Sequence, residues 1–370
     1  MQRHNGTLTT RLTIRPLTML PLSGLTLLVV LLVAACSGPS GTVSCTLTLE
    51  QLNNVDPTPP ECLALLPDPQ STLSPRIFIL GSETDLDGNL HIYAHGVDGA
   101  SVPIPLSDFQ TLTTVSVDGT VRLDNGGDQN GGGVTVQAVA DGSPISLAFL
   151  TDYSASINDA NLAQIGQVYA QVLNALPTGF EAQVLNFSDT TDVRQDWTED
   201  LPAMLAAVAF DDTFAPRNNT AFYDGIGNTL DRLDQPPGSG LADRCRPARI
   251  FISHTDGLEN ASFTYSKVDL LTRIDDSRTI AIMLGTLTAS VTELDDFAGA
   301  RGAFVYAYDV NGIETAVSGW AGSFGNIVEF VINAGITNFN PDVPGAVQID
   351  LGTLSVMVEA PYDMPCIPLP

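Results

Sequence analysis

Basic residues are scarce in this sequence of 370 residues. It contains a single lysine, Lys267, and 15 Lys and Arg residues stand against 42 Asp and Glu residues, giving a formal net charge of −27 at pH 7. Nucleic-acid phosphates and anionic lipids are bound mainly by clusters of Lys and Arg. The shortage of these residues excludes nucleic acid as a partner and excludes electrostatic binding to an anionic membrane. We interpret the acidity as a source of solubility rather than as a specific binding surface.

Sequence motifs of the common catalytic centres are also missing. None of the five cysteines lies in a C-x-x-C or Cys/His spacing, so zinc binding and thiol redox chemistry have no support. The sequence has no H-E-x-x-H motif, no G-x-S-x-G motif and no phosphate-binding glycine loop. These absences favour a protein that is not an enzyme. A metal-dependent hydrolase is the weaker alternative, because no general base for a metal-bound water is evident.

Residues 1–35 have the features of a secretory signal peptide. Arg3, Arg11 and Arg15 precede an apolar run that ends at Cys36. The Val-Ala-Ala-Cys sequence at this point resembles the lipobox of bacterial lipoproteins, which implies cleavage before Cys36 and its acylation. We therefore expect a lipoprotein of the bacterial cell envelope, held on the extracytoplasmic side of a membrane by its lipid anchor. The alternative is an uncleaved membrane-spanning anchor.

Four cysteines remain in the expected mature chain, and four cysteines allow three pairings. They are Cys45, Cys62, Cys245 and Cys366. An extracytoplasmic compartment favours disulfide bonds between them. We favour pairing Cys45 with Cys62 and Cys245 with Cys366. Cys245 precedes a predicted strand, at the end of the sheet where we expect the C-terminal tail to leave.

The chain begins its expected mature part with a tether and a β-rich region. Residues 36–74 are rich in Pro, Ser, Thr and Gly, a composition typical of a linker. Residues 75–145 contain short β-type runs separated by Asp-Gly pairs, which predict a small β-sandwich-like module. At Asp85 a hairpin turn is favoured over a calcium loop, because further ligand positions are missing. Since about seventy residues make a marginal core, we expect residues 343–360, within the tail over 337–370, to complete the module.

Residues 146–336 alternate strand-like and helix-like segments, which is typical of a parallel α/β sheet. The first strand is an apolar run that ends at Asp152, with Ser154 and Ser156 just beyond. Ligands of open α/β sheets bind beyond the carboxyl ends of strands. Oxygen donors at that place suit a hard divalent cation, Mg²⁺ first and Ca²⁺ or Mn²⁺ next. The last helix is expected over residues 323–333.

Three short motifs in this region resemble the von Willebrand factor type A domain. Residues 152–156 match the D-x-S-x-S motif of its metal-ion-dependent adhesion site, residues 218–224 look like its threonine loop before a helix, and residues 250–257 look like its strand ending in T-D-G. The resemblance implies an α/β fold with a doubly wound, mostly parallel sheet and flanking helices, here joined to the β-sandwich-like N-terminal module. It also implies five metal-site residues: Asp152, Ser154, Ser156, Thr220 and Asp256.

The resemblance further implies roles for these five residues. Ser154 and Ser156 would bind the metal directly, and Thr220 directly or through water. Asp152 and Asp256 would act mainly through water and through hydrogen bonds to the hydroxyls. An open coordination position would accept an acidic side chain of a protein partner, so the expected function is metal-dependent binding or adhesion. The alternatives are a structural subunit of a cell-envelope assembly, or a domain that keeps the fold without using the metal.

Two positions depart from the family pattern. Ala155 stands where glycine is common, and we expect alanine to be tolerated unless the backbone there needs a positive φ. His254 stands where an apolar residue is common, and we expect it to be a neutral histidine of the core or sheet edge rather than a ligand.

Overall fold

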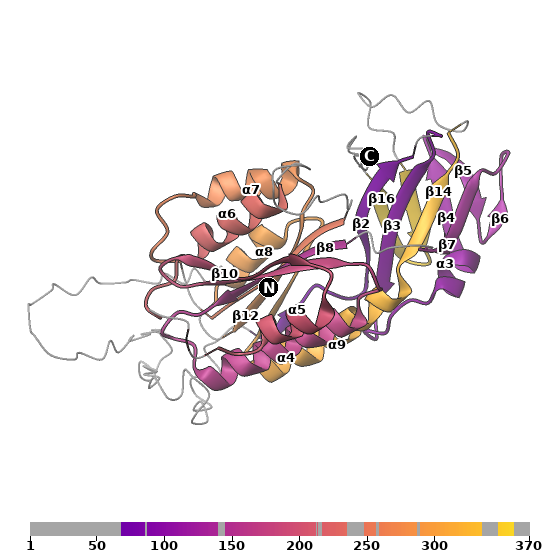
Figure 1. The fold of residues 1–370 in the computed structure, drawn as a ribbon. Helices are drawn as coiled ribbons and strands as arrows, with labels where there is room; N and C mark the ends of the chain where they lie inside the picture. Colours follow the sequence, from indigo (N-terminus) through magenta and orange to yellow (C-terminus); the bar gives the residue numbers. More distant parts are fainter. Residues whose placement is uncertain are drawn as a thin grey trace, which may run out of the picture. The chain divides into compact units, whose positions relative to one another are not determined.

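The computed structural model describes residues 68–358, apart from residues 86, 140–144, 212, 214–216, 235–247, 257–258, 287–288 and 335–346 (Figure 1). The expected signal peptide and all five cysteines lie outside the described residues, so lipidation and the disulfide pairing stay predictions. Among the described residues, no helix combines the length and apolar character needed to cross a membrane.

A seven-stranded sheet forms the centre of the α/β domain, in the order β1-β13-β12-β11-β8-β9-β10. The five inner strands run parallel to one another, and the two edge strands are antiparallel to their neighbours. The expected α/β fold with a mostly parallel sheet is therefore confirmed. The strands are β1 (Gln70–Ser71), β8 (Ile145–Asp152), β9 (Glu181–Phe187), β10 (Thr191–Thr198), β11 (Ala248–Thr255), β12 (Ile280–Thr286) and β13 (Ala303–Ala307).

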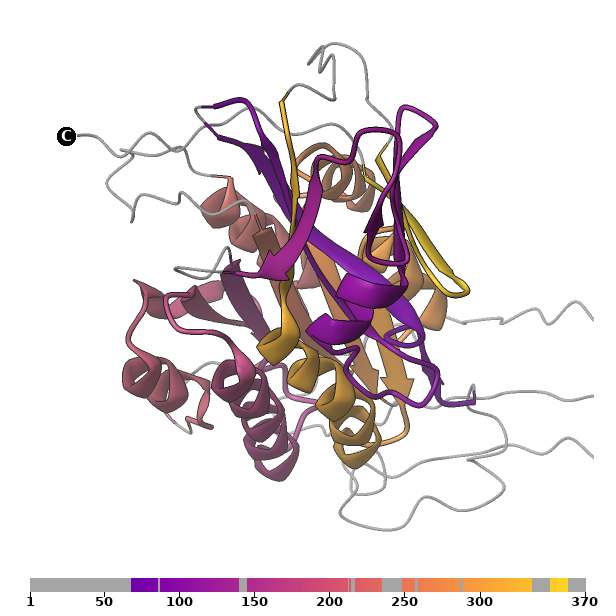
Figure 2. The same ribbon diagram turned by 90° about the vertical axis from the view of Figure 1, so that its right-hand side faces the viewer.

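Helices cover both faces of this sheet (Figure 1). One face carries three helices, of which the first and last lie side by side (Figure 2): α4 (Asp159–Ala175), α5 (Leu201–Val208) and α9 (Val310–Ser323). The other face carries α6 (Phe222–Leu233), α7 (Lys267–Asp276) and α8 (Val291–Ala298).

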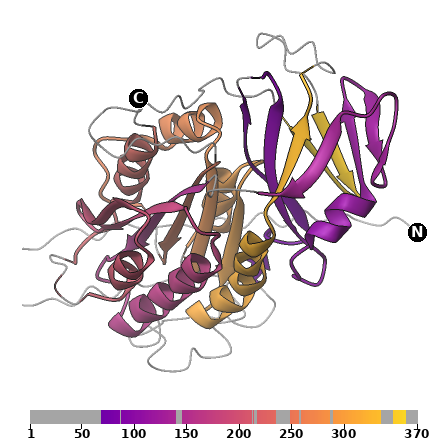
Figure 3. The ribbon, with the colours of Figure 1, turned by 45° about the vertical axis from the view of Figure 1, so that its right-hand side comes forward.

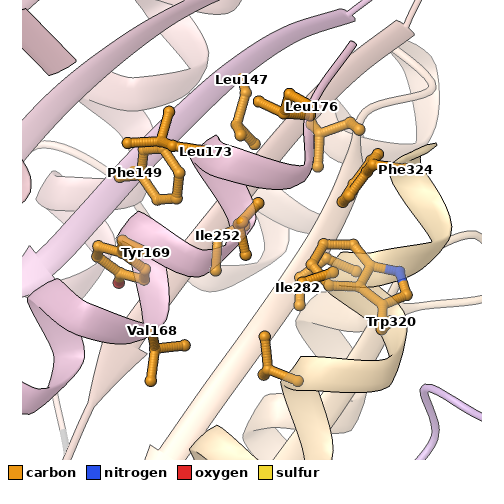
Figure 4. Packing of buried hydrophobic residues seen from close by; sticks show 14 of the residues in the cluster. Leu147, Phe149, Val168, Tyr169, Leu173, Leu176, Ile252, Ile282, Trp320 and Phe324 are labelled. Atoms are coloured by element: carbon orange, nitrogen blue, oxygen red, sulfur yellow. The ribbon is translucent and has the colours of Figure 1, made fainter. Parts of the chain in front are cut away.

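The apolar run of β8 follows from this double cover. Leu147 and Phe149 pack with the α4 and α9 side of the sheet, whereas Ala148 and Leu150 pack with the α6 and α8 side. Successive strand residues point to opposite faces, so a strand covered on both sides needs apolar residues at every position. Figure 4 shows Leu147 and Phe149 within the core on the α4 and α9 side of the sheet. The Phe149 ring lies beside that of Tyr169, with centroids 4.6 Å apart. The polar residues of β8, Ser146, Thr151 and Asp152, lie toward its two ends and are buried as well.

A second group of strands forms two sheets packed around their own core (Figure 3). One sheet has the order β2-β3-β14-β7 and the other has the order β16-β15-β4-β5-β6. The C-terminal strand β15 pairs with β4, with Val347 opposite Val117, so residues from both ends of the described chain share one core. The elements are β2 (Arg76–Thr84), β3 (Leu90–Val97), α3 (Leu106–Leu112), β4 (Thr113–Val117), β5 (Thr120–Asp124), β6 (Gly127–Asp128), β7 (Val134–Ala138), β14 (Val328–Ile332), β15 (Val347–Leu351) and β16 (Leu354–Val358).

The helix expected over residues 323–333 is wrong. The helix α9 ends at Ser323, a short 3₁₀ turn (Phe324–Asn326) follows, and Val328–Ile332 forms β14 between β3 and β7. Its sequence VEFVI alternates: Val328 and Phe330 face the sandwich core. Alternation and β-branched residues favour a strand over a helix.

Helix α9 also packs against β3. Trp320 and Phe324 surround the buried ring of His95, which is stacked on Phe78 with ring centroids 5.0 Å apart. His95 Nδ1 lies 2.5 Å from Ser323 Oγ. Burial lowers the pKa of His95 to about 3, so this histidine is neutral and acts as a packing group.

His91 on β3 is held between two carboxylates. Its Nδ1 lies 2.7 Å from Glu329 Oε1 on β14, and its Nε2 lies 3.1 Å from Asp85 Oδ2 in the turn after β2. Glu83 faces it across the strand pair. Burial alone would lower the pKa of His91, but the two carboxylates outweigh it and raise the pKa. Asp85 also accepts from the Asn89 backbone, the geometry of the expected hairpin turn.

We predict that His91 stabilises the protein most at low pH. A raised folded-state pKa gives stability that is fully present below the unfolded value of about 6.5 and is lost as pH rises through the folded value. The loss of unfolding free energy in His91→Gln should be about 1 kcal/mol larger near about pH 5.5 than near about pH 9. Urea denaturation at the two pH values measures it. An equal loss at both would show that no charged imidazole is held there.

Candidate metal centre

Asp152, the last residue of β8, joins two neighbouring strands at their carboxyl ends. Its Oδ1 accepts a hydrogen bond from the Ser154 backbone N–H (2.8 Å). Its Oδ2 accepts from the hydroxyl of Thr255 on β11 (2.8 Å). The Asp152 side chain is fully buried. The loop that carries the two serines is therefore folded back by the carboxylate at its start, an arrangement common where an aspartate begins a turn.

The two serines continue this network to the next strand. Ser154 Oγ lies 3.0 Å from Ser156 Oγ, and the Ser156 hydroxyl donates to Asp256 Oδ1 over 2.9 Å. Ser154 and Asp256 are buried, whereas Ser156 is exposed. The structure thus brings together four of the five predicted residues in one connected group that reaches solvent at Ser156.

Thr220, the fifth predicted residue, lies in a loop fixed against this group. The Ala155 N–H donates to the Asn218 carbonyl (3.1 Å), which places the loop beside the two serines. The Thr220 N–H donates to Asn260 Oδ1 (2.9 Å), and the Asn260 N–H donates to the Thr220 carbonyl (3.1 Å). Within the described part of the chain no hydrogen bond joins the Thr220 hydroxyl to the other four side chains. These bonds bring the Thr220 backbone to the site.

Asp189 is a supporting residue that the sequence analysis did not identify. Its carboxylate accepts hydrogen bonds from the Asn218 side chain (2.8 Å) and from the backbone and side chain of Asn219 (3.0 and 2.8 Å). These bonds lower the pKa of Asp189. The neighbouring Ser188 accepts from the Asn218 N–H (3.1 Å). Both residues follow strand β9 directly, so the pattern that identified Asp152 after β8 would also have found them.

The electrostatics of the group suit a cation. Asp152 and Asp256 are both buried; burial raises the pKa of each carboxyl, and the nearby charge of Asp152 raises that of Asp256 further. Arg217 lowers the pKa of Asp152, but its guanidinium also contacts Asp159 and the Ile157 carbonyl. A bound cation would offset this cost of ionising two buried carboxyls, and with the three hydroxyl residues beside them they form a donor set for a hard divalent ion.

The donor set is poor in charged ligands. Across the described residues, no group of three or more His, Cys, Asp or Glu side chains could hold a metal ion. A metal at this place would therefore depend on hydroxyl oxygens from Ser154, Ser156 and Thr220, with the two carboxylates behind them. This arrangement fits Mg²⁺ or Mn²⁺ better than a thiolate- or imidazole-bound metal.

Four of the five metal-site residues are buried, namely Asp152, Ser154, Thr220 and Asp256, and Ser156 is exposed. Ala155 does not have a positive φ, so the change from the family's glycine causes no strain. His254 is buried, and burial lowers its pKa to about 3, so it is neutral, as expected.

We predict that Asp189 positions the Thr220 loop. Because residues that orient ligands typically change metal affinity by about 10- to 100-fold, Asp189→Ala should weaken Mg²⁺ binding at least about ten-fold. Isothermal titration calorimetry measures this. Asp192→Ala, which removes an exposed carboxylate from the same segment, is the matched control and should bind as the wild type does. Equal affinities in both variants would remove Asp189 from the site.

No model of a protein family and no curated protein matches the sequence. Several solved structures are similar to parts of the chain. Proximal thread matrix protein 1 from the mussel byssus, in a structure with a zinc-occupied MIDAS motif, is similar over 54% of this chain and 50% of that chain, at 18% identity and a TM-score of 0.40. BatB from Bacteroides thetaiotaomicron is similar over 47% of this chain and 95% of that chain, at 13% identity and a TM-score of 0.35. An aerotolerance-related membrane protein from Bacteroides fragilis is similar over 47% of this chain and 96% of that chain, at 11% identity and a TM-score of 0.36. The chain spans about half the length of the mussel protein, and the assignment of the site rests on the chain's own residues.

Proposed function

We propose that the α/β domain binds a divalent cation, and through it an acidic side chain of a protein partner. One observation supports this most: a continuous hydrogen-bonded group runs from Ser154 through Ser156 to Asp256, at the edge of the sheet where strands β8 and β11 end. We infer Mg²⁺ as the resident ion, with Mn²⁺ or Ca²⁺ as substitutes. The ion would supply positive charge and an open coordination position in an otherwise acidic protein.

We also propose a location in the cell envelope for this protein and assign it no catalytic role. The chain would be a lipoprotein of the bacterial cell envelope, acting in extracytoplasmic binding or adhesion. Ser154, Ser156 and Thr220 are already assigned to the metal, and the two buried carboxylates to holding the hydroxyls. A general base for hydrolysis is not apparent among the described residues around the site. Hydrolysis of a panel of peptides or esters by the purified protein would contradict the non-catalytic assignment.

A pull-down from envelope extract tests the binding function. The full chain serves as bait in Mg²⁺ and in EDTA, beside a Ser156→Ala variant, which loses one exposed hydroxyl and its hydrogen bond to Asp256. We expect a partner retained by the wild type in Mg²⁺ only, and lost in the variant. Changing the partner's Asp or Glu to Asn or Gln should also abolish retention. A partner retained equally in EDTA would favour a structural subunit of an envelope assembly.

The lipid anchor gives a separate prediction. Acyl chains on Cys36 would provide the hydrophobic attachment, so Cys36→Ser should abolish the mass increase of lipidation and shift the protein out of the membrane fraction or leave it as the precursor. Mass spectrometry and membrane fractionation measure both effects. Cys45→Ser is the control and should remain in the membrane. Unchanged mass and partition of the Cys36→Ser protein would refute the anchor.

A further inference from the structure

The segment 259–265 covers the N-terminus of α6, the helix that follows Thr220. The residue before this helix, Ala221, has no side chain that could cap it. Instead the Tyr223 N–H donates to Glu259 Oε2 (2.9 Å), and the Asp224 N–H donates to Ser262 Oγ (2.9 Å). Free N–H groups at the start of a helix need such acceptors. Here a segment from a distant part of the sequence provides them.

Helix α6 in turn accepts hydrogen bonds from the segment, and these bonds fix the backbone of the segment. Asp224 in the first turn of α6 accepts three consecutive backbone N–H bonds, from Phe263 (3.0 Å), Thr264 (2.9 Å) and Tyr265 (3.0 Å). Glu259 Oε1 accepts from Ala261 (2.7 Å) and Ser262 (2.6 Å) in addition. Carboxylates that accept several N–H bonds bind them strongly. The backbone of residues 259–265 is therefore fixed by hydrogen bonds, and we call this segment the held loop.

Phe263 is displayed on this held loop. Its side chain is 94% exposed, whereas the next most exposed large apolar side chain among the described residues, that of Val268, is 71% exposed. Single exposed apolar residues are ordinary on protein surfaces. The difference here is the rigid backbone: its own N–H and those of the two following residues are bonded to Asp224, while the ring contacts solvent.

Phe263 lies near the proposed metal centre. Asn260, three residues earlier, exchanges two hydrogen bonds with Thr220. Three residues of chain span at most about 10 Å, so Phe263 lies within that distance of a residue in contact with the site. The exposed Phe263 ring is thus held on the same loop as Asn260, which contacts the Thr220 backbone.

Charge narrows the chemistry of the partner. The region around the held loop carries Asp231, Asp269 and Asp296 on α6 to α8, and Lys267 is paired with Asp296 (2.7 Å). With a net charge of −27, the chain repels a partner rich in acidic residues. One carboxylate can be accepted at the metal, and charge favours neutral or basic residues as its neighbours.

We infer that Phe263 forms an apolar subsite beside the metal centre, which receives a leucine- or phenylalanine-like side chain adjacent to the partner's metal-bound carboxylate. This inference rests on the proposed metal-dependent function. It names the partner as an extended segment with a single acidic residue flanked by apolar ones, and the held loop as the element that selects it.

Synthetic peptides test the subsite on the full chain. Each peptide has one central Asp, whose neighbours are Gly, Ser, Leu or Phe, with Lys at the ends to keep the charge constant. Fluorescence anisotropy in Mg²⁺ and in EDTA gives the affinities. In Mg²⁺ the Leu and Phe peptides should bind at least about ten-fold more tightly than the Gly and Ser peptides, the effect expected from burying one large apolar side chain.

Three variants locate the effect. Phe263→Ala should lose the ten-fold preference and keep the Mg²⁺-dependent binding of the Gly peptide, whereas Phe263→Leu should keep most of the preference. Leu112→Ala, an exposed apolar residue on α3 of the other module, should behave as the wild type. Mg²⁺-dependent binding without an apolar preference, or with one that survives in Phe263→Ala, overturns the subsite and leaves the metal function standing. Absence of Mg²⁺-dependent binding to every peptide overturns both.

Discussion

Replacing Trp320 with alanine is expected to lower the free energy of unfolding by about 3–5 kcal/mol, the usual cost of truncating a large buried aromatic residue. Trp320 is 1% exposed and lies on α9, where its ring meets Phe324 (centroids 4.8 Å apart), Phe78 (6.3 Å) and His95 (6.2 Å). It therefore packs both against the 3₁₀ turn that follows its helix and against β2 and β3. The cavity would loosen the sheet that contains β14, which follows α9 along the chain.

A matched variant separates packing from hydrogen bonding. Trp320 Nε1 has no hydrogen-bond partner among the described residues, so Trp320→Phe loses volume but no polar contact. It should cost less than half as much as Trp320→Ala. Urea denaturation followed by circular dichroism measures both. A loss below about 1 kcal/mol for the alanine variant would mean that this contact between α9 and β3 does not stabilise the fold.

Asp256→Asn is expected to abolish Mg²⁺-dependent stabilisation while leaving the metal-free protein at least as stable as the wild type. In EDTA the pKa of Asp256 is raised by burial and by the nearby charge of Asp152, so a neutral amide is tolerated in place of the carboxyl, and its oxygen can still accept from Ser156. A ligand at a hundred times its Kd stabilises a protein by about 2.7 kcal/mol. The wild type should gain about that much in saturating Mg²⁺, and the variant should gain nothing.

Thermal unfolding in EDTA and in Mg²⁺ measures this prediction, with Asp192→Asn on β10 as the exposed control. The control should respond to Mg²⁺ as the wild type does. Relative to the wild type, the variant should be at least as stable in EDTA but less stable in saturating Mg²⁺. A residue that only supports the fold would lose stability in both conditions. A variant that is destabilised in EDTA, or that still gains stability from Mg²⁺, would place the ion elsewhere.

The sequence predicted the structure best where a local residue pattern is enough to determine the position of an element in the fold. The apolar run before Asp152 predicted a doubly covered strand, and strand ends of a parallel sheet lie on one edge, so Ser154, Ser156 and Asp256 could be placed together in advance. The helix over 323–333 failed because the alternating pattern of Val328–Ile332, which favours a strand, spans only five residues and was taken as the continuation of a helix. The segment forms a strand because it pairs with β3 and β7, which lie more than a hundred residues earlier in the sequence.

Contacts between distant polar residues were outside the reach of the sequence. The sequence around Glu259 and Asp224 contains no capping motif, because each carboxylate binds N–H groups of the other's segment. The burial of Asp152 could not be predicted for a related reason: the exposure of a residue at a strand end depends on what packs around it in the folded chain, which no local pattern encodes.

We propose that Asp152, Ser154, Ser156, Thr220 and Asp256 form a divalent-ion site. Crystals of the protein grown with Mn²⁺, measured at the manganese absorption edge, test it most directly, because the anomalous signal locates the ion without reference to any partner. We predict the strongest peak within coordination distance of the Ser154 and Ser156 hydroxyls, beside Thr220. A peak elsewhere, or no peak at this edge of the sheet at saturating Mn²⁺, would contradict the assignment.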